Sequence, residues 1–172
     1  MRLCCCRNSP VQGAGVVFTD EKHILAGYQP YKTKPCISGI GGSSEPGENY
    51  LTTAIREMLE ELFEPSNDSA KLQNLNLQIQ AKYIPKRIIQ SGDYTMIIYN
   101  FNDLESILGF IHENGLITPL YTVFPLSLID LIRERKVEIG VEISHFALLP
   151  LIRQVSIDSN LISDIQLLCT PT

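Results

Sequence analysis

The stretch that begins at Gly41 and ends at Glu64 (GGSSEPGENYLTTAIREMLEELFE) limits what this chain can fold into more than any other part of it. Its apolar residues recur at the spacing of one helix face, namely Leu51, Ala54, Ile55, Met58 and Leu62. Its acidic residues recur on a second face, namely Glu57, Glu60, Glu61 and Glu64. The pattern predicts a helix that buries the first face in a core and ends before Pro65.

The acidic face is unfavourable for an isolated helix. Like charges three or four residues apart repel by a few tenths of a kcal/mol per pair, and acids near a helix C-terminus oppose the macrodipole. Arg56 is the only basic residue in the stretch, so the penalty without a counter-ion is ~1–2 kcal/mol. Glu61 lies nearest the apolar face, where we expect its carboxylate to be partly shielded from water.

Glycines precede the acidic face and favour a cation site over an ordinary solvated surface. We expect Gly41 and Gly42 to form a turn whose backbone a ligand can approach closely. Carboxylate and carbonyl oxygens together suit Mg²⁺ or Mn²⁺ and suit zinc poorly. Local conflicts of this kind concentrate at functional sites. The stretch therefore predicts a divalent cation held by oxygen ligands.

The same residues resemble the signature of the Nudix hydrolases. That signature reads Gly, five residues, Glu, seven residues, Arg-Glu, an aliphatic residue, any residue, Glu-Glu, any residue, Gly and an aliphatic residue. Gly42, Glu48 and residues 56–61 match it. Phe63 stands in place of the last Gly and Glu64 in place of the last aliphatic residue, so the exit from the helix departs from the family pattern.

The resemblance implies a role for each acid of the helix. Glu57, Glu60 and Glu61 would coordinate Mg²⁺ or Mn²⁺ with help from the backbone carbonyl of Gly41, and they would be the catalytic residues. Glu57 would also position or deprotonate the attacking water. Metal ions of this kind lower the pKa of bound water and neutralise the charge of a leaving phosphate.

The remaining signature residues are expected to be structural. Gly42, Glu48 and Arg56 complete the box, and the resemblance implies that Glu48 and Arg56 form an ion pair that joins the loop to the helix. Many family members add a carboxylate from outside the box. The candidates here are Glu105, Glu113, Glu138 and Glu142, of which Glu113 is the choice because it precedes an apolar stretch at residues 121–125.

Strands before and after the acidic helix predict an α/β fold with a mixed sheet. The resemblance implies a Nudix-type α/β/α sandwich in which residues 1–172 form a single domain. Strands are expected at residues 13–19, 23–27, 36–40, 75–89 and 94–101. Further helices are expected at residues 102–115, 126–135, 144–155 and 160–168.

Composition narrows the class of protein. The chain has 172 residues, 44% of them hydrophobic, which suits one compact domain. Its net charge of −5 disfavours general binding to nucleic acid or acidic membranes, and no apolar run reaches the ~20 residues that span a bilayer. The five cysteines have no CxxC pairing, so a reducing cytoplasm is expected. Cys4, Cys5 and Cys6 would begin an apolar strand, with lipidation and redox sensing as the alternatives.

The sequence predicts a Mg²⁺-dependent pyrophosphohydrolase that cleaves a diphosphate bond in a nucleoside diphosphate linked to another group. Decapping of mRNA, hydrolysis of diphosphoinositol polyphosphates and a non-catalytic nucleotide-sensing module are the alternatives, and a homodimer is compatible with the chain. Candidates for binding substrate phosphates are Lys32, Lys34, Lys86 and Arg87. A basic strip for capped RNA would need Lys82, Lys86, Arg87, Arg133, Arg135 and Lys136.

Overall fold

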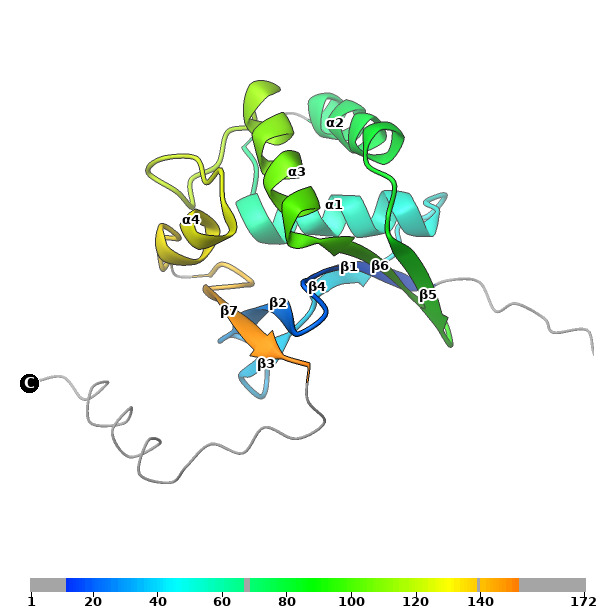
Figure 1. Ribbon diagram of the computed structural model, residues 1–172, viewed down its shortest axis with the longest axis horizontal. Coiled ribbons are helices and arrows are strands. Elements are labelled where there is room, and N and C mark those ends of the chain that lie inside the picture. The colour runs from blue at the N-terminus through cyan, green and yellow to red at the C-terminus, as the bar shows by residue number, and fades with distance from the viewer. Residues whose placement is uncertain (1–11, 67–68, 139, 152–172) are drawn as a thin grey trace, which may run out of the picture.

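The structure, a computed structural model, describes residues 12–66, 69–138 and 140–151. This part of the chain contains one mixed sheet of seven strands and four helices, which confirms the mixed α/β class (Figure 1). The strands are β1 (Gly13–Thr19), β2 (His23–Gln29), β3 (Cys36–Ser38), β4 (Ile40–Ser43), β5 (Arg87–Ser91), β6 (Tyr94–Asn100) and β7 (His145–Pro150). The helices are α1 (Tyr50–Phe63), α2 (Ser69–Lys82), α3 (Phe101–Glu113) and α4 (Leu128–Arg133).

The sheet divides into two arms next to the turn between β1 and β2. These two strands pair at Thr19 and Ile24. Along the rest of its length β1 pairs with β4 and, in parallel, with β6, which pairs with β5. β2 pairs instead with β3 and β7. We call β4-β1-β6-β5 the first arm and β3-β2-β7 the second arm.

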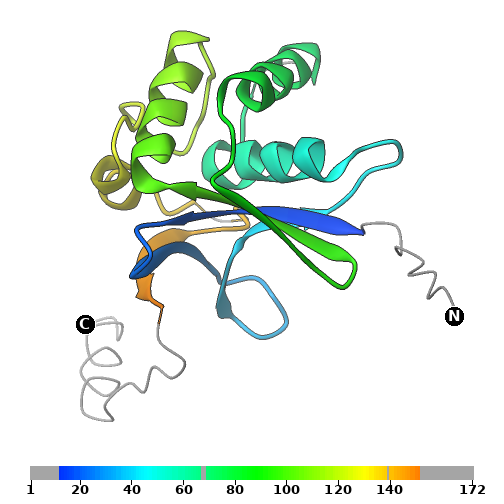
Figure 2. The same cartoon turned by 45° about the vertical axis from the view of Figure 1, so that its right-hand side comes forward.

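Helix α1 packs its predicted apolar face on the first arm. Ala54, Ile55, Met58 and Leu62 are completely buried, and they meet the inward residues of β1 and β6. In both views α1, α2 and α3 lie on the same side of β1 and β6 (Figure 2). The inward residues of these strands are Ala14, Val16, Phe18, Ile97 and Tyr99. This packing holds the acidic face of α1 beside β4.

Helix α1 ends where the sequence predicts, and Asn49 caps its other end. The Asn49 side chain accepts hydrogen bonds from the backbone N–H groups of Leu51 and Thr52, which satisfies two of the free donors at the N-terminus. Glu64 ends the helix in the left-handed conformation, with a φ of 42°, and Pro65 follows. The orientation of the acids is therefore fixed from both ends.

The strand predicted at residues 75–89 is wrong in its first half, because α2 occupies residues up to Lys82 and β5 begins at Arg87. The alternation LNLQIQ imitates a strand, but Leu75 and Ile79 are also one helical turn apart and both are buried. Asn76 donates from Nδ2 to the carbonyl of Thr52 at 2.9 Å. Packing against α1 therefore decides the conformation.

The helix predicted at residues 144–155 is also wrong, because β7 occupies His145–Pro150. Its apolar run pairs with β2 from His23 opposite Pro150 to Tyr28 opposite His145. A proline is also poorly placed inside a helix. The helix predicted at residues 160–168 and the strand predicted around Cys4, Cys5 and Cys6 lie outside the described residues.

Smaller differences concern element boundaries. The strand predicted at residues 36–40 is divided by Gly39 into β3 and β4, and Gly41 and Gly42 lie within β4 and not in a turn. Helix α3 occupies Phe101–Glu113 and is capped by Asn100, whereas the prediction was a helix at residues 102–115. Helix α4 is shorter than the predicted 126–135. Within the described residues no helix is long and apolar enough to cross a membrane.

Candidate active site

Glu61 is the most deeply buried acid of the predicted site, with 4% of its surface exposed. Its Oε2 accepts a hydrogen bond from the backbone N–H of Gly41 at 2.7 Å, and its Oε1 accepts one from Nε2 of Gln29 at 3.3 Å. Burial, together with the nearby carboxylates of Glu142 and Glu57, raises the pKa of Glu61 to about 8, although the hydrogen bond from the Gly41 N–H opposes the shift. Without a cation, the ionised form of this carboxylate is therefore disfavoured.

Glu57 lies against Gly42 on the same side of the helix. A Cβ added at Gly42 would lie 2.6 Å from the carboxyl carbon and both carboxyl oxygens of Glu57. Glycine is therefore required here by the close approach of the carboxylate and not by a turn. Burial raises the pKa of Glu57 overall, although the nearby guanidinium of Arg56 opposes this shift.

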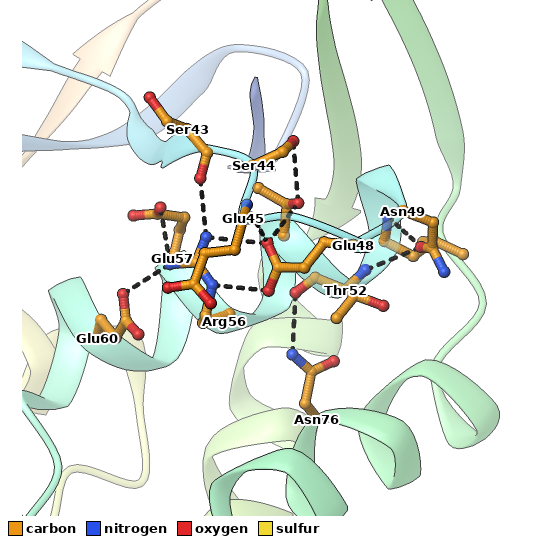
Figure 3. Close-up of polar contacts among 12 residues, drawn as sticks. Ser43, Ser44, Glu45, Glu48, Asn49, Thr52, Arg56, Glu57, Glu60 and Asn76 are labelled. Carbon is orange, nitrogen blue, oxygen red and sulfur yellow. Dashed lines mark hydrogen bonds and ion pairs between the residues drawn. The ribbon is translucent and has the colours of Figure 1, made fainter. Parts of the chain in front are cut away.

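Arg56 and Glu48 form the ion pair that the family resemblance implies (Figure 3). Nε of Arg56 donates to Glu48 at 2.8 Å, and its other nitrogens donate to Glu57 and Glu60 at 2.9 Å and to the carbonyl of Ser43 at 2.8 Å. The bond from Arg56 lowers the pKa of Glu48 to about 2. This pair fixes the loop before α1, while Glu60 is half exposed at the edge of the network.

Among the candidates outside the box, Glu142 meets the buried acids. Nε2 of Gln29 donates to Oε1 of Glu142 at 3.0 Å, and the charge of Glu142 raises the pKa of both Glu57 and Glu61. Exposure does not distinguish it, because Glu142 is exposed like the other three candidates, namely Glu105 on α3, Glu113 at the last position of α3, and Glu138. Gln29 itself has no sequence signal that would have singled it out, since its role depends on segments far away in the chain.

The exit of α1, where the sequence departs from the signature, is capped by side chains from elsewhere. Nη1 of Arg135 donates to the carbonyl of Leu62 at 2.7 Å, and Nη2 donates to the carbonyl of Glu61 at 3.0 Å. Thr118 donates to the carbonyl of Phe63, whose ring is completely buried and stacks on Phe124 at 5.2 Å. An apolar residue at position 63 therefore fills the core while distant donors satisfy the helix end.

Arg135 is consequently unavailable to a surface strip for RNA. It is 8% exposed, and Nε and Nη2 also donate to the carbonyl of Ile143 at 3.0 and 2.6 Å. It lies 4.6 Å from the ring of Phe146 as a cation–π contact. The predicted strip therefore lacks one of its six members, and Arg135 instead joins the end of α1 to the segment that carries Glu142.

The structure separates the four predicted phosphate-binding residues. Lys32 and Lys34 are exposed between β2 and β3, and the positive charge of Lys32 acts against the raised pKa of Glu61. Lys86 forms an exposed ion pair with Glu21, and Arg87 begins β5, the outer strand of the first arm. Of these four residues, Lys32 is the one whose positive charge acts on the pKa of Glu61.

Tyr94 adds an aromatic surface next to the acids. A side chain at Gly15 or Gly41 would collide with its hydroxyl group, and one at Gly13 would approach its ring to 3.0 Å. Burial raises the pKa of Tyr94, and the carboxylates of Glu61 and Glu57 raise it further. The ring therefore lies over the glycines of β1, with its hydroxyl group at β4.

The residues of the site fit a divalent cation in their chemistry. Among the described residues, no three Asp, Glu, His or Cys side chains lie close enough together to form a finished metal site. The donors nevertheless are hard oxygens, and the close packing of Glu57 on Gly42 admits no side chain between them. Oε1 of Gln29 is buried without a hydrogen-bond partner in the described part of the chain. Acids that are costly to ionise alone are the ligands that a cation would stabilise.

Solved structures of known proteins match this chain at low similarity. This chain is similar to a NUDIX hydrolase from Nitrosomonas europaea, with 17% identity, a TM-score of 0.37, and coverage of 95% of this chain and 82% of that one. It is similar to a NUDIX-family hydrolase from Clostridium perfringens, with 16% identity, a TM-score of 0.36, and coverage of 92% and 94%. An Ap4A hydrolase from C. elegans gives 18% identity, a TM-score of 0.30, and coverage of 52% and 66%. No curated protein matches the chain by sequence.

A family model identifies the family to which the chain belongs. The NUDIX domain model matches residues 9–108, which is more than half of the 172 residues. The match includes the whole signature from Gly42 to Glu64 and therefore the buried acids of α1. The chain belongs to the NUDIX family and is a hydrolase that acts on pyrophosphate bonds.

Proposed function

We propose that this protein is a Mg²⁺-dependent hydrolase, also active with Mn²⁺, that cleaves the diphosphate bond of a nucleoside diphosphate linked to another group. The observation that carries the proposal is the buried carboxylate of Glu61, held by the Gly41 N–H beside Glu57. Burial makes ionisation of this carboxylate unfavourable. In a family of pyrophosphate hydrolases, such a carboxylate is best explained by a cation that binds it.

Each residue of the site has a distinct task in this proposal. Glu57, Glu60 and Glu61 would hold the cation together with the carbonyl of Gly41, and Glu57 would also orient the attacking water. Arg56 keeps Glu57 and Glu60 in place through two hydrogen bonds of 2.9 Å. When bound, a divalent cation neutralises anionic charge on the diphosphate and lowers the pKa of bound water.

Substrate recognition would come from the groups around the acids. Lys32 and Lys34 are exposed on the segment between β2 and β3, so we propose them for the phosphates. Tyr94 lies beside the acids and would offer its ring or its hydroxyl group to the nucleoside. Lys86 forms an ion pair with Glu21, and Arg87 lies on the outer strand of the first arm. We therefore propose a smaller contribution of these two residues to phosphate binding.

The proposal predicts product release from at least one nucleotide derivative in the presence of Mg²⁺. The panel consists of nucleoside triphosphates, ADP-ribose, dinucleotide cofactors, Ap4A, diphosphoinositol phosphates and capped RNA, with products separated by chromatography. Turnover should disappear with excess EDTA and return with Mg²⁺. Tight binding of a nucleotide without any product would contradict the proposal and favour the nucleotide-sensing module.

The same panel separates RNA from small substrates. Phosphate contacts along an RNA release counter-ions, so binding of capped RNA should fall steeply between 50 and 200 mM salt, by about 10³-fold if six contacts form. A small nucleotide should show only a weak dependence on salt. The burial of Arg135 and the pairing of Lys86 with Glu21 favour the small substrate.

Replacing Gly42 by alanine should reduce turnover by about 10-fold or more, because the new Cβ would displace the carboxylate of Glu57, and small misplacements at a reacting site are costly. Only the end of a flexible side chain has to move, so we expect the melting temperature to change little. Gly39→Ala is the matched control, since a Cβ there would have no atom within 4 Å. Equal activity of the two variants would contradict a role for Glu57 at its present position.

A further inference from the structure

One amide group connects the two arms of the sheet at the site. Gln29 ends β2 in the second arm and is 2% exposed. Its Nε2 donates to Glu142, which precedes β7, at 3.0 Å, and to Glu61 on α1 at 3.3 Å. Because α1 packs on the first arm, these two hydrogen bonds bring carboxylates from both arms to one nitrogen.

The chemistry of this contact is specific to an amide. Two carboxylates close together repel each other, and here a group with two N–H bonds lies between them. The opposite orientation of the amide would direct its carbonyl oxygen at two anions, which is unfavourable. Leucine or methionine would occupy similar space without donating a hydrogen bond. The observed orientation therefore follows from the charges on either side of the amide.

The second half of the amide has no partner. Oε1 of Gln29 is buried and accepts no hydrogen bond in the described part of the chain, although a buried carbonyl oxygen without a partner usually costs ~1–3 kcal/mol. Such an atom next to two carboxylates marks a place where a ligand or its hydration completes the bonding. This observation is independent of the acids themselves.

We propose that Gln29 is a positioning residue that holds Glu142 against Glu61, so that a carboxylate from the second arm joins those of α1 in binding one divalent cation. The inference rests on the proposed function, because it needs a cation at this site. A carboxylate from outside the box is what the family resemblance already implies. The new element is Gln29, which acts through Glu61 and Glu142 and requires no contact with substrate.

The test measures Mn²⁺ binding to the full chain, by the loss of the free-ion signal in electron paramagnetic resonance, without any substrate. Loss of a residue that orients a metal ligand usually weakens metal binding by 10- to 100-fold. We therefore expect Gln29→Met and Glu142→Gln each to weaken Mn²⁺ binding by about 10-fold or more. The double variant should bind little worse than either single variant, because both changes remove the same arrangement.

Gln90→Met is the matched control. Gln90 is exposed on β5, and its side chain donates only to the carbonyl of Gly92 in the described residues. It should bind Mn²⁺ as the wild type does. Should Gln29→Met fail to fold, Gln29→Asn replaces it, since the shorter side chain keeps the amide but moves it away from the two carboxylates. The same weakened binding is expected of that variant.

The outcomes distinguish this inference from the proposed function. Wild-type affinity in a folded Gln29→Met or Gln29→Asn variant would overturn the positioning role, as would fully additive effects of Gln29→Met and Glu142→Gln. In either case Mn²⁺ binding by the wild type would leave the proposed function standing. Failure of the wild type itself to bind Mn²⁺ would overturn both.

Discussion

Replacing Glu61 by glutamine is expected to lower turnover by about 10²-fold or more while making the metal-free protein more stable above neutral pH. The loss of activity follows because the cation bound by this carboxylate supplies several kcal/mol of transition-state stabilisation. The gain in stability follows because glutamine has the same shape and needs no ionisation in a buried place. Steady-state kinetics with Mg²⁺ and thermal unfolding with EDTA measure the two effects.

The pH dependence of unfolding gives the sign of the stability effect. Burial raises the pKa of Glu61 from its usual 4.5 to about 8, so the folded state binds a proton that the unfolded state has released. The stability of the metal-free wild type should therefore be highest below pH 4.5 for this group and fall as the pH rises to about 8. We expect a total change on the order of 5 kcal/mol, since the pKa rises from 4.5 to about 8 and each pH unit contributes about 1.4 kcal/mol. Glu61→Gln should remove this slope.

Glu64→Gln is the control for both measurements. Glu64 belongs to the same predicted acidic face but is exposed at the C-cap of α1. The same chemical change there should leave turnover, melting temperature and pH dependence close to those of the wild type. Loss of activity in Glu64→Gln equal to that in Glu61→Gln would show that overall charge matters and not the buried carboxylate.

Arg135→Met is expected to destabilise the protein by about 3–5 kcal/mol. Three buried carbonyl groups, those of Glu61, Leu62 and Ile143, would lose their donor, and each such loss costs ~1–3 kcal/mol. The change also removes a cation from the negative end of α1. Relief from burying a charge offsets part of this. For a chain of this size the melting temperature should fall by about 10 °C.

Arg133→Met separates this effect from a general loss of positive charge. Arg133 is exposed in the last turn of α4, only two positions from Arg135, so the same substitution is tested in nearly the same place. Its melting temperature should stay within ~2 °C of the wild type, as for most surface changes. Equal melting temperatures of the two variants would contradict the capping role of Arg135.

The local pattern predicted α1 because it depends on short spacings, and the family resemblance implied the pair formed by Arg56 and Glu48. Glu61 was expected at the apolar edge, and the structure buries it further than the helix alone requires, since Gly41 and Gln29 close over it. The short-range pattern failed at residues 75–82 and 145–150, where packing on α1 and pairing with β2 select the conformation. An apolar run of this length fits a helix or a strand equally well.

The rest of the site depends on contacts between distant segments. Arginine is usually a surface residue, and Arg135 was therefore grouped with other basic residues. In the structure it donates hydrogen bonds to the end of α1, more than 70 positions away in the sequence. Gln29 and Glu142 are brought together by the pairing of β2 with β7. Spacing along a single sequence contains no information about such long-range contacts, so the sequence led to Glu113 and left Glu142 among the other three candidates.

The pairing of β2 with β7 has a consequence for the order in which the protein is made. Gln29 and Glu142 are 113 positions apart, so they meet only after most of the chain has left the ribosome. Closing so large a loop is slow and entropically costly. The emerging chain therefore contains the acids of α1 before Glu142 has been synthesised. Tight cation binding should begin only when β7 has paired with β2.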